Sequence, residues 1–212
     1  MAQRESIPLG EIAEIFVGLA RHGKGLSSNE NHPTHKLIGL KALQAHGLDF
    51  EAIENVHLDP EFDYSYYQIA AHDLLLACRA TEMRIVLAPR EVAGMLIDAN
   101  VMAIRCGPRL APQVLAAYLR HPAAGRTALE QASQSTTAQK NLTVKAMKRL
   151  ALPLPLRHEQ EQLVQLLETA ELQYQLALQA AEKRMLVAQQ VVLNVLYRGS
   201  GNGAGAILTH DA

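Results

Sequence analysis

The chain has 212 residues, which suffices for one ordinary domain or for one domain with an appendage. Apolar residues make up 49%, enough for a core, yet no apolar run reaches the roughly 18 residues that span a bilayer, and the first residues do not resemble a signal peptide. The net charge of −1 excludes a uniformly basic protein, and two cysteines, Cys78 and Cys106, are too few for a disulfide framework or a cysteine zinc cluster, so we expect a cytoplasmic protein.

Residues 1–156 mix short runs of strand length with short helical segments. Apolar runs predict strands at 12–17, 36–40, 73–78, 84–88 and 101–106. The first of these alternates enough for a strand or a helix end. Helices are predicted at 112–120, which has a proline near its start, and at 125–132. Because strands and helices do not alternate regularly, we predict an α+β domain with a mixed sheet of about six strands rather than a doubly wound fold.

Residues 157–198 predict one continuous helix of about 60 Å. Pro153 and Pro155 end any helix before it, and the segment itself contains neither Gly nor Pro. Its apolar residues recur at alternating spacings of three and four, and Arg184 is the one charged residue on this seam. The seam comprises Leu163, Leu167, Ala170, Tyr174, Ala177, Ala181, Ala188, Val191 and Val195.

A second apolar set, including Leu166, Leu176 and Leu196, widens the apolar face beyond a two-helix seam. We therefore expect the helix to pack against a partner outside its own domain. The alternative is a helix folded back over that domain. The Gly-rich residues 199–212 predict a flexible tail.

Charge is distributed unevenly along the first region. No lysine or arginine lies between Lys41 and Arg79, whereas seven acidic residues do. From Arg120 to Arg157 the balance reverses, with Glu130 as the one acidic residue. Such a basic segment suits contact with phosphates, and the alternative is two oppositely charged surfaces without a function.

The search for catalytic chemistry returns negatives. The sequence has no methyltransferase motif, no Walker motif, no His-Glu-x-x-His and no Gly-x-Ser-x-Gly. His32 and His35 lack further ligands at a metal-site spacing, and the carboxylates at 59–63 are interpreted as a solvated turn. Tyr64, Tyr66 and Tyr67 are interpreted as a partly buried strand edge, with base stacking as the alternative. We expect no catalytic residue, metal or cofactor.

Three polar or basic loops are the candidates for contact with DNA. Gln pairs with adenine, Arg pairs with guanine or phosphate, and Ser, Thr and Lys hold phosphates or bases. For each loop alone, a solvent-exposed linker is the alternative. The candidate residues are Arg21, Lys24 and Ser27 in the first loop, Arg79, Thr81 and Arg84 in the second, and Ser135, Thr136, Thr137, Gln139 and Lys140 in the third.

Several segments, in this order, resemble the specificity subunits of type I restriction–modification systems. They are Ile-Pro-Leu-Gly-Glu-Ile-Ala-Glu-Ile-Phe-Val-Gly at 7–18, Ala-His-Asp-Leu-Leu-Leu-Ala-Cys-Arg at 71–79, and Ala-Leu-Pro-Leu-Pro-Leu-Arg-His-Glu-Gln-Glu-Gln-Leu at 151–163. The resemblance extends to about residue 198. Members of that family usually carry two recognition domains and two long helices, whereas this chain matches one of each, as in a half-length form.

The resemblance implies that residues 1–156 form a target-recognition domain that contacts double-stranded DNA through the major groove. It implies that residues 157–198 pair with a second helix and dock an adenine-specific DNA methyltransferase subunit, and that a restriction subunit (nuclease and translocase) joins the complex for phage defence. The chain itself would be non-catalytic and homodimeric. Two copies paired antiparallel would read identical half-sites in opposite orientation, several base pairs to more than a turn apart.

Two other functions fit parts of the same sequence. One is a protein-interaction adaptor that uses the long helix without reading DNA. The other is a small DNA-modifying enzyme, such as a nuclease or a methyltransferase fragment, which the missing motifs disfavour.

Overall fold

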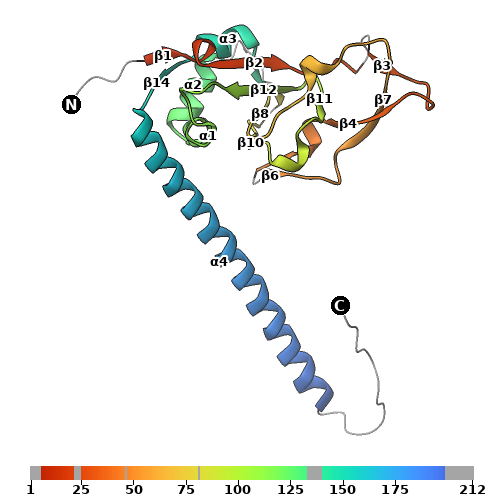
Figure 1. Cartoon of the computed structure of the whole chain (residues 1–212). Coiled ribbons are helices and arrows are strands. Elements are labelled where there is room, and N and C mark those ends of the chain that lie inside the picture. The colour runs from red at the N-terminus through yellow and green to blue at the C-terminus, as the bar shows by residue number, and fades with distance from the viewer. Residues whose placement is uncertain (1–5, 22–24, 46, 81, 133–139, 199–212) are drawn as a thin grey trace. The chain divides into compact units, whose positions relative to one another are not determined.

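The computed structural model describes residues 6–21, 25–45, 47–80, 82–132 and 140–198 (Figure 1). Contacts within the chain divide it into two units, Met1–Gln165 and Leu166–Ala212. The first unit holds all the described strands, the short helices and the first turns of the long helix. The second unit holds the rest of that helix.

A four-stranded antiparallel sheet, the main sheet, forms the centre of the first unit. Its strands stand in the order β10 (Ile85–Leu87), β8 (Leu74–Ala77), β12 (Val101–Cys106) and β2 (Ala13–Val17). All four residues of β8 are buried. Successive side chains of a strand point to opposite faces, so an unbroken apolar run indicates that both faces of the main sheet are covered.

Helices cover one face of the main sheet. These are α1 (Pro112–Arg120), α2 (Ala124–Ala132) and α3 (Val144–Arg149). Their buried residues, among them Leu115, Leu129 and Met147, join Leu74 and Leu76 of β8 in one core cluster. Burial of each such leucine contributes roughly 1.5–3 kcal/mol.

A second four-stranded sheet reaches the core on the other face through the ends of two of its strands. Its order is β11 (Leu96–Ile97), β4 (Thr34–Ile38), β7 (Glu54–Leu58) and β3 (Leu26–Ser27), with β11 parallel to β4 and the other pairs antiparallel. Ile38 and Ile97 join Phe16, Leu75 and Ala77 of the main sheet in a second core cluster.

Short elements complete the first unit. The two-stranded pairs are β1 (Ser6–Pro8) with β14 (Ala151–Pro153), β5 (Leu43–Gln44) with β6 (Gly47–Leu48), and β9 (Arg79–Ala80) with β13 (Lys140–Asn141). The 3₁₀ helices are η1 (Leu9–Glu11), η2 (Leu40–Ala42), η3 (Ser65–Tyr67) and η4 (Arg90–Val92).

The α+β class with short helices and one long carboxy-terminal helix is confirmed, but the sheet count is wrong. Instead of one sheet of about six strands, the described residues form two sheets of four strands and three short pairs. β3 and β11 have two residues each, too few for a periodic pattern, and β7 lies in the acidic segment with mostly half-buried side chains. Such strands are identified only by their partners.

The tyrosine-rich segment also differs from the prediction. Ser65–Tyr67 form η3 rather than a strand edge. Asp63 Oδ1 accepts a hydrogen bond from the Ser65 backbone N–H at 2.9 Å, which turns the chain just before η3. The hydrogen bond from Ser65 also lowers the pKa of the Asp63 carboxyl.

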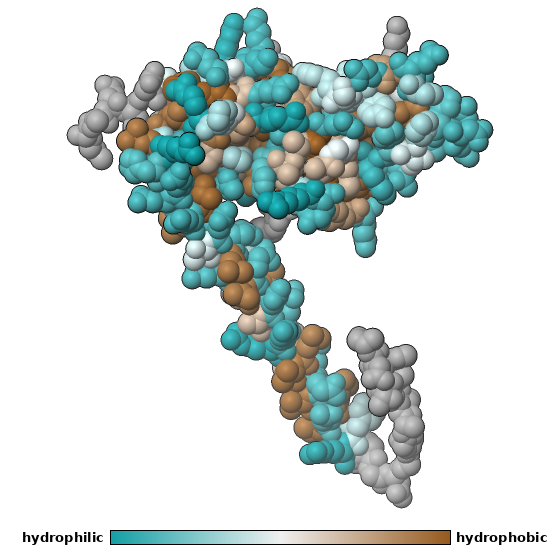
Figure 2. All heavy atoms as spheres, viewed as in Figure 1, coloured by the Kyte–Doolittle hydropathy of each residue, from teal (hydrophilic) through white to brown (hydrophobic). Residues whose placement is uncertain are grey.

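The long helix α4 (Arg157–Arg198) occupies the predicted range. Glu159 Oε2 accepts from the Leu156 N–H at 2.8 Å and so caps the first turn. Along the second unit, apolar side chains are exposed: Leu166 and Leu186 are each 64% exposed and Leu196 is 63% exposed. Figure 2 shows hydrophobic residues in brown along the helix. Within the described part of the chain, no helix combines the length and apolarity needed to cross a membrane.

Candidate nucleic-acid interface

One edge of the main sheet, called here the loop edge, is where β2 and β8 end and β12 begins. Met102 pairs with both Val17 and Leu76, so these three residues stand in one row. Since β2 and β8 both run antiparallel to β12, their carboxyl ends leave the sheet on the same side. The loops that carry Arg21 and Arg79 follow these two ends.

Backbone hydrogen bonds hold the segments of the loop edge together. Leu19 N–H donates to Ile97 O at 2.8 Å, Ala99 N–H donates to Leu19 O at 2.8 Å, and Cys78 N–H donates to Asn100 O at 2.9 Å. A Cβ at Gly18 would lie 1.8 Å from Ile97 O, so only glycine allows β2 to approach so closely. The residues 98–100 therefore stand between the two candidate loops.

Arg21 is held in place by two carboxylates. Its Nη1 and Nη2 donate to Glu54 at 2.7 and 3.0 Å, and its Nε donates to Asp98 Oδ2 at 3.3 Å. The hydrogen bond to Glu54 raises the pKa of Arg21, and the same bond lowers the pKa of Glu54. Asp98 is 1% exposed and also accepts from Asn100 N–H at 2.9 Å. The charge of Arg21 is thus shared with two acids and supports the loop edge.

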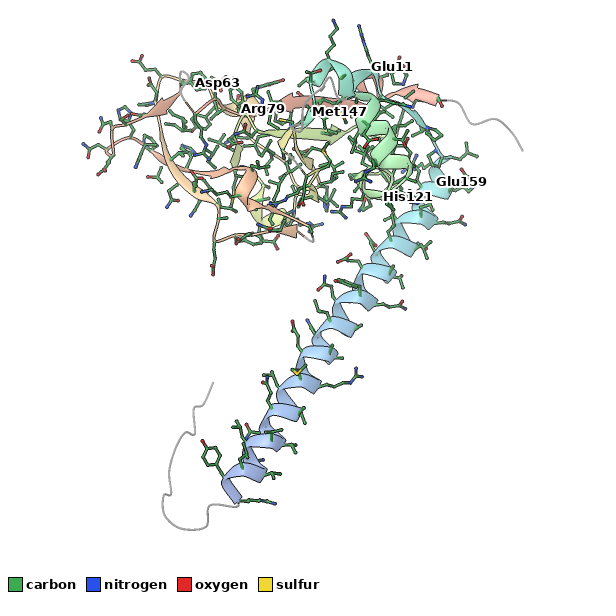
Figure 3. The ribbon with its side chains drawn as sticks, turned by 180° about the vertical axis from the view of Figure 1, so that it is seen from behind. Glu11, Asp63, Arg79, His121, Met147 and Glu159 are labelled. Carbon is green, nitrogen blue, oxygen red and sulfur yellow. The ribbon has the colours of Figure 1, made fainter. Side chains whose placement is uncertain are left out.

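The second candidate loop and Lys140, the last candidate of the third, meet at the loop edge. Arg79 pairs with Asn141 and Ala80 with Lys140 in the short β9–β13 ladder, and Leu142 N–H donates to Cys78 O at 3.0 Å. Arg79 is exposed, and no described residue forms an ion pair with it. Figure 3 shows Arg79 well apart from Glu159, which lies at the start of α4. Arg79 is therefore a cation available to an external anion.

Arg84 closes the β8–β10 hairpin at the same edge. Its carbonyl accepts from Ala77 N–H at 3.0 Å, and its Nη1 donates to Leu43 O at 2.9 Å. The side chain is half-buried, so part of its hydrogen-bonding capacity is used inside the protein.

Ser27 lies in the second sheet. It pairs with His57, three residues along β7 from Glu54, or about 10 Å. Its hydroxyl accepts from Asn29 N–H at 3.0 Å. Of the other candidates, Lys24, Thr81, Ser135, Thr136, Thr137 and Gln139 lie outside the described residues, and Lys140 is described only in its backbone.

Two buried polar contacts were missed by sequence reasoning. Asp73, 1% exposed, accepts from Arg105 Nη2 at 2.8 Å and Nε at 3.1 Å, and the guanidinium lies 5.5 Å from the Phe16 ring centroid. The hydrogen bond that Arg105 donates to Asp73 raises the pKa of Arg105. Arg105 stands inside the apolar-looking strand β12, and no local pattern indicates that its partner is Asp73.

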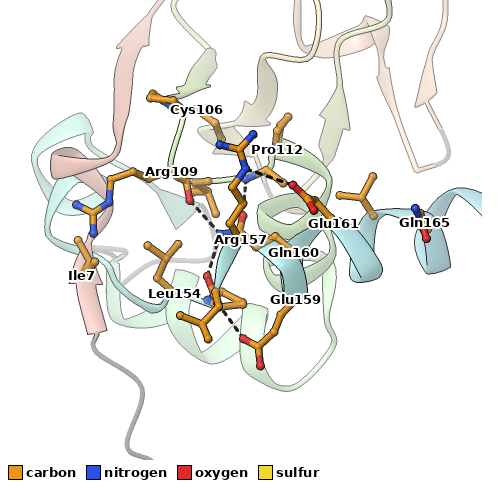
Figure 4. Close-up of a pocket in the computed structure, with 17 residues that line it drawn as sticks. Ile7, Cys106, Arg109, Pro112, Leu154, Arg157, Glu159, Gln160, Glu161 and Gln165 are labelled. Atoms are coloured by element: carbon orange, nitrogen blue, oxygen red, sulfur yellow. Dashed lines mark hydrogen bonds and ion pairs between the residues drawn. The ribbon is translucent and has the colours of Figure 1, made fainter.

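Gln160 is the second missed residue, and it is 6% exposed. Its Oε1 accepts from Ala111 N–H at 2.7 Å, and its Nε2 donates to Arg109 O at 2.9 Å and Pro155 O at 3.0 Å (Figure 4). These bonds tie the first turn of α4 to the segment before α1. The Glu-Gln-Glu-Gln sequence was the available signal, but its two glutamines look equivalent without the structure.

A groove of about 1570 Å³ opens beside Gln160. Its apolar lining includes Ile7, Leu154, Leu156 and Val164, and its charged lining includes Arg157 and Glu161 (Figure 4). Across the described residues, no group of three or more His, Cys, Asp or Glu side chains is placed to hold a metal ion.

No protein-family model matches the chain, and no curated protein matches it in sequence. Solved structures do match it, among them the following two. One is a chain from a structural study of complex assembly and conformational transition of the type I R-M system. It aligns with 19% sequence identity and a TM-score of 0.59, and the alignment covers 92% of this chain and 44% of that chain. The HsdS subunit from Thermoanaerobacter tengcongensis aligns with 20% identity and a TM-score of 0.55, over 93% and 46%. The chain has the fold of HsdS.

The predicted resemblance to type I specificity subunits is thus confirmed at the level of the fold. The chain spans less than half the length of either matched structure. The alignment includes nearly all of this chain, so the similarity is not confined to the long helix or to the sheets alone.

Proposed function

We propose that this protein is a non-catalytic DNA-binding specificity subunit of a type I restriction–modification system or a related methylation-based defence system. In this role it directs a partner adenine methyltransferase, and a restriction subunit where one is present, to a bipartite DNA site. The shared fold with HsdS supports the class of protein. The loop edge supports DNA contact and carries the proposal.

The loop edge gathers candidate residues that are far apart in sequence. Arg21, Arg79, Arg84 and the strand that begins at Lys140 all meet there. Arg79 is the best-placed phosphate or base contact because it is exposed and free of a described acidic partner. Arg21 stabilises this edge through its bonds to Glu54 and Asp98. Arg84 does so through its hydrogen bond to the Leu43 carbonyl.

The long helix supports the second half of the proposal. Its exposed apolar side chains require a partner, because a helix of 42 residues with such a surface is not stable alone in water. We assign this surface to pairing with a second copy and to docking of the methyltransferase subunit. Paired copies present two recognition domains and therefore a bipartite site.

Binding to DNA is tested by fluorescence anisotropy with a random duplex between about 50 and 200 mM salt. The protein is expected to bind with an affinity that falls steeply as the salt concentration rises. Arg79→Ala is expected to weaken binding and to reduce the slope of log affinity against log salt concentration by about one, the value of one phosphate contact. Arg90→Ala is the matched control, since Arg90 is an exposed arginine that follows β10 at the opposite edge of the main sheet.

Two results would contradict the proposal. Wild-type protein that does not bind duplex at low salt would favour the protein-interaction adaptor. If Arg79→Ala and Arg90→Ala reduce the affinity for DNA equally, the protein binds DNA over its whole surface rather than at the loop edge.

A further inference from the structure

The basic segment that begins at the end of α1 contains arginines that already have partners in the protein. Arg120 donates to a backbone carbonyl of β10 at 3.1 Å. Arg126 lies 3.7 Å from Glu130, and Arg157 lies 3.2 Å from Glu161. These three arginines are therefore engaged within the first unit.

Three cations of α3 differ, because no described acidic residue forms an ion pair with them. They are Lys145, Lys148 and Arg149, all exposed. Residues three and four apart share one face of a helix, so the three cations form one surface, called here the α3 face. Met147 lies on the other side of α3 and is buried in the core. Residues 131–158 contain no Asp or Glu, so the α3 face concentrates positive charge.

The 3₁₀ helix η1 packs against α3 and positions one of the three cations. Leu9 N–H donates to Leu150 O at 2.8 Å, which fixes η1 beside the end of α3. A Cβ at Gly10 would lie 2.9 Å from Lys148 Cβ, so the stem of this lysine rests on the η1 backbone. Glu11 of η1 forms no ion pair with α3 in the described part of the chain (Figure 3). Because its stem is already placed, Lys148 loses less side-chain freedom when it meets an anion.

A groove of about 870 Å³ lies beside the α3 face, between α2 and α3. Lys145 and Arg149 line it together with Thr127 and Gln131 of α2, whose side chains are exposed. Phosphate oxygens accept hydrogen bonds from Lys, Arg, Thr and Gln side chains alike. The groove therefore places neutral donors next to two cations.

The α3 face follows directly on the loop edge. Arg79 stands opposite Asn141 in the β9–β13 ladder, and Lys145 follows Asn141 by four residues. Four residues span at most about 14 Å, and the helix adds about 6 Å from Lys145 to Arg149. Each strand of duplex DNA carries a phosphate about every 3.4 Å along the axis, so about 20 Å includes about six phosphates on each strand. One stretch of duplex backbone is thus long enough to meet both Arg79 and the α3 face.

We propose that the α3 face is a second DNA contact, which binds the phosphate backbone next to the bases that the loop edge reads. The inference rests on the proposed function and deepens it by adding a sequence-independent contact. Phosphate contacts set the position of a protein on the duplex, whereas contacts to base edges carry the sequence information. Duplex DNA is favoured over an acidic protein because the α3 face adjoins the loop edge, where Arg79 is open to the same polyanion.

Removal of the charges is tested with the full chain, by fluorescence anisotropy on a random duplex between about 50 and 200 mM salt. The triple variant Lys145→Ala, Lys148→Ala and Arg149→Ala is expected to weaken binding. It is also expected to reduce the slope of log affinity against log salt concentration by about two to three, nearly one for each lost contact.

The matched control is a second triple variant, Lys36→Ala, Lys41→Ala and Arg90→Ala. It removes three exposed cations from β4, η2 and η4 and so changes the net charge equally. The control is expected to keep the slope of the wild type. Equal reductions by the two triple variants would overturn the inference, because binding would then depend on net charge rather than on the α3 face.

A charge-conserving exchange separates phosphate contact from base readout. Lys145→Arg, Lys148→Arg and Arg149→Lys together keep the three charges and change the shapes of the side chains. A phosphate contact depends chiefly on charge, so this variant is expected to keep the slope and the affinity of the wild type. A loss of affinity as large as that of the alanine triple variant would overturn the assignment to phosphates.

Proximity to DNA is tested by photo-cross-linking. Lys148→Cys, labelled on the new thiol with an azidophenacyl group, is expected to cross-link to the random duplex on illumination at low salt, whereas labelled Lys41→Cys is not. The wild-type chain is the control for its own thiols, Cys78 and Cys106, because burial raises the pKa of both. No cross-link from Lys148→Cys, or equal cross-linking from both positions, would overturn the inference.

The outcomes separate the inference from the proposed function. If the wild type binds duplex and the α3 triple variant keeps its slope, the inference is overturned and the proposed role of the loop edge stands. If that variant keeps the slope but no longer associates with a methyltransferase subunit, the α3 face docks protein and the inference is likewise overturned. Wild-type protein that does not bind duplex would overturn the proposed function, and the inference with it.

Discussion

Among the described charged side chains at the loop edge, several build the edge, whereas Arg79 is open to a ligand. Asp98 is buried and accepts from both Arg21 and Asn100, so it joins the end of β2 to the start of β12. Arg79 has no such role and is exposed. Arg21 and Arg79, two exposed arginines of the same edge, therefore serve different purposes, and only their partners distinguish them.

Asp98→Ala is expected to lower the free energy of unfolding by about 2 kcal/mol, because it leaves the Asn100 N–H without its acceptor and removes one of the two carboxylates that Arg21 contacts. Urea denaturation followed by circular dichroism measures the change. Asp63→Ala removes another backbone-capping carboxylate, on an exposed turn, and is the control. Equal effects of the two substitutions would contradict the structural role of Asp98.

Glu54 predicts a dependence of stability on pH. Its pKa in the folded protein lies below the usual value of 4.5, chiefly because Arg21 donates to its charged form. A lowered folded-state pKa gives stability that is present above pH 4.5 and is lost as the pH falls through the folded value.

Glu54→Gln is therefore expected to destabilise the protein at neutral pH and to flatten the loss of stability below about pH 4.5. Unfolding by urea at pH 7 and at pH 3 to 4 measures both effects, with Glu30→Gln, an exposed carboxylate, as the control. If Glu54→Gln loses as much free energy of unfolding in acid as the wild type, the ion pair between Arg21 and Glu54 is excluded as a source of the pH dependence of stability.

Elements differ in how far the sequence predicts them. α4 was predicted at its observed bounds because its signals are local: prolines before it, no glycine or proline within it, and a heptad seam. Val101–Cys106 and Pro112–Arg120 were likewise predicted at their bounds. The second sheet was not predicted, because β3 and β11 acquire their strand character from pairing with distant segments.

The start of α4 depends on Gln160. Gln160→Leu is expected to cost about 1–3 kcal/mol, since the variant leaves Ala111 N–H, Arg109 O and Pro155 O without their partner in a buried site. Hydrogen exchange should also show faster exchange at Ala111 and in the first turn of α4. Gln162→Leu is the control, because Gln162 is exposed on the same turns. Equal stability of the two variants would contradict a fastening role for Gln160.

At the scale of the whole molecule, the two units differ in whether their apolar residues are buried or exposed. The first buries its apolar residues in three clusters, whereas the second exposes them along α4. Apolar surface of that extent marks an interface with another protein. The proposed pairing of α4 with a second copy covers it, and two identical copies in a closed pair are related by a twofold axis.

A twofold axis predicts the symmetry of the DNA site. Adenine methylation that depends on this protein alone as specificity subunit is expected at an inverted repeat with a non-specific spacer. Sequencing of methylated adenines in the host, with and without the gene, measures this. Deletion of an unrelated methyltransferase gene is the control. A motif with two different halves would exclude two identical copies as the reader of the site.

The sequence by itself determined the α+β class, the long helix with its seam, and the loops in which polar and basic residues gather. These follow from composition and periodicity within a few turns or strands. Tertiary structure decided which loops share an edge, that Arg21 is paired and Arg79 open, and that Gln160 is buried. The reason is distance along the chain: Arg21 meets a carboxylate 77 residues away and Gln160 meets a carbonyl 51 residues away, so no local pattern records either contact.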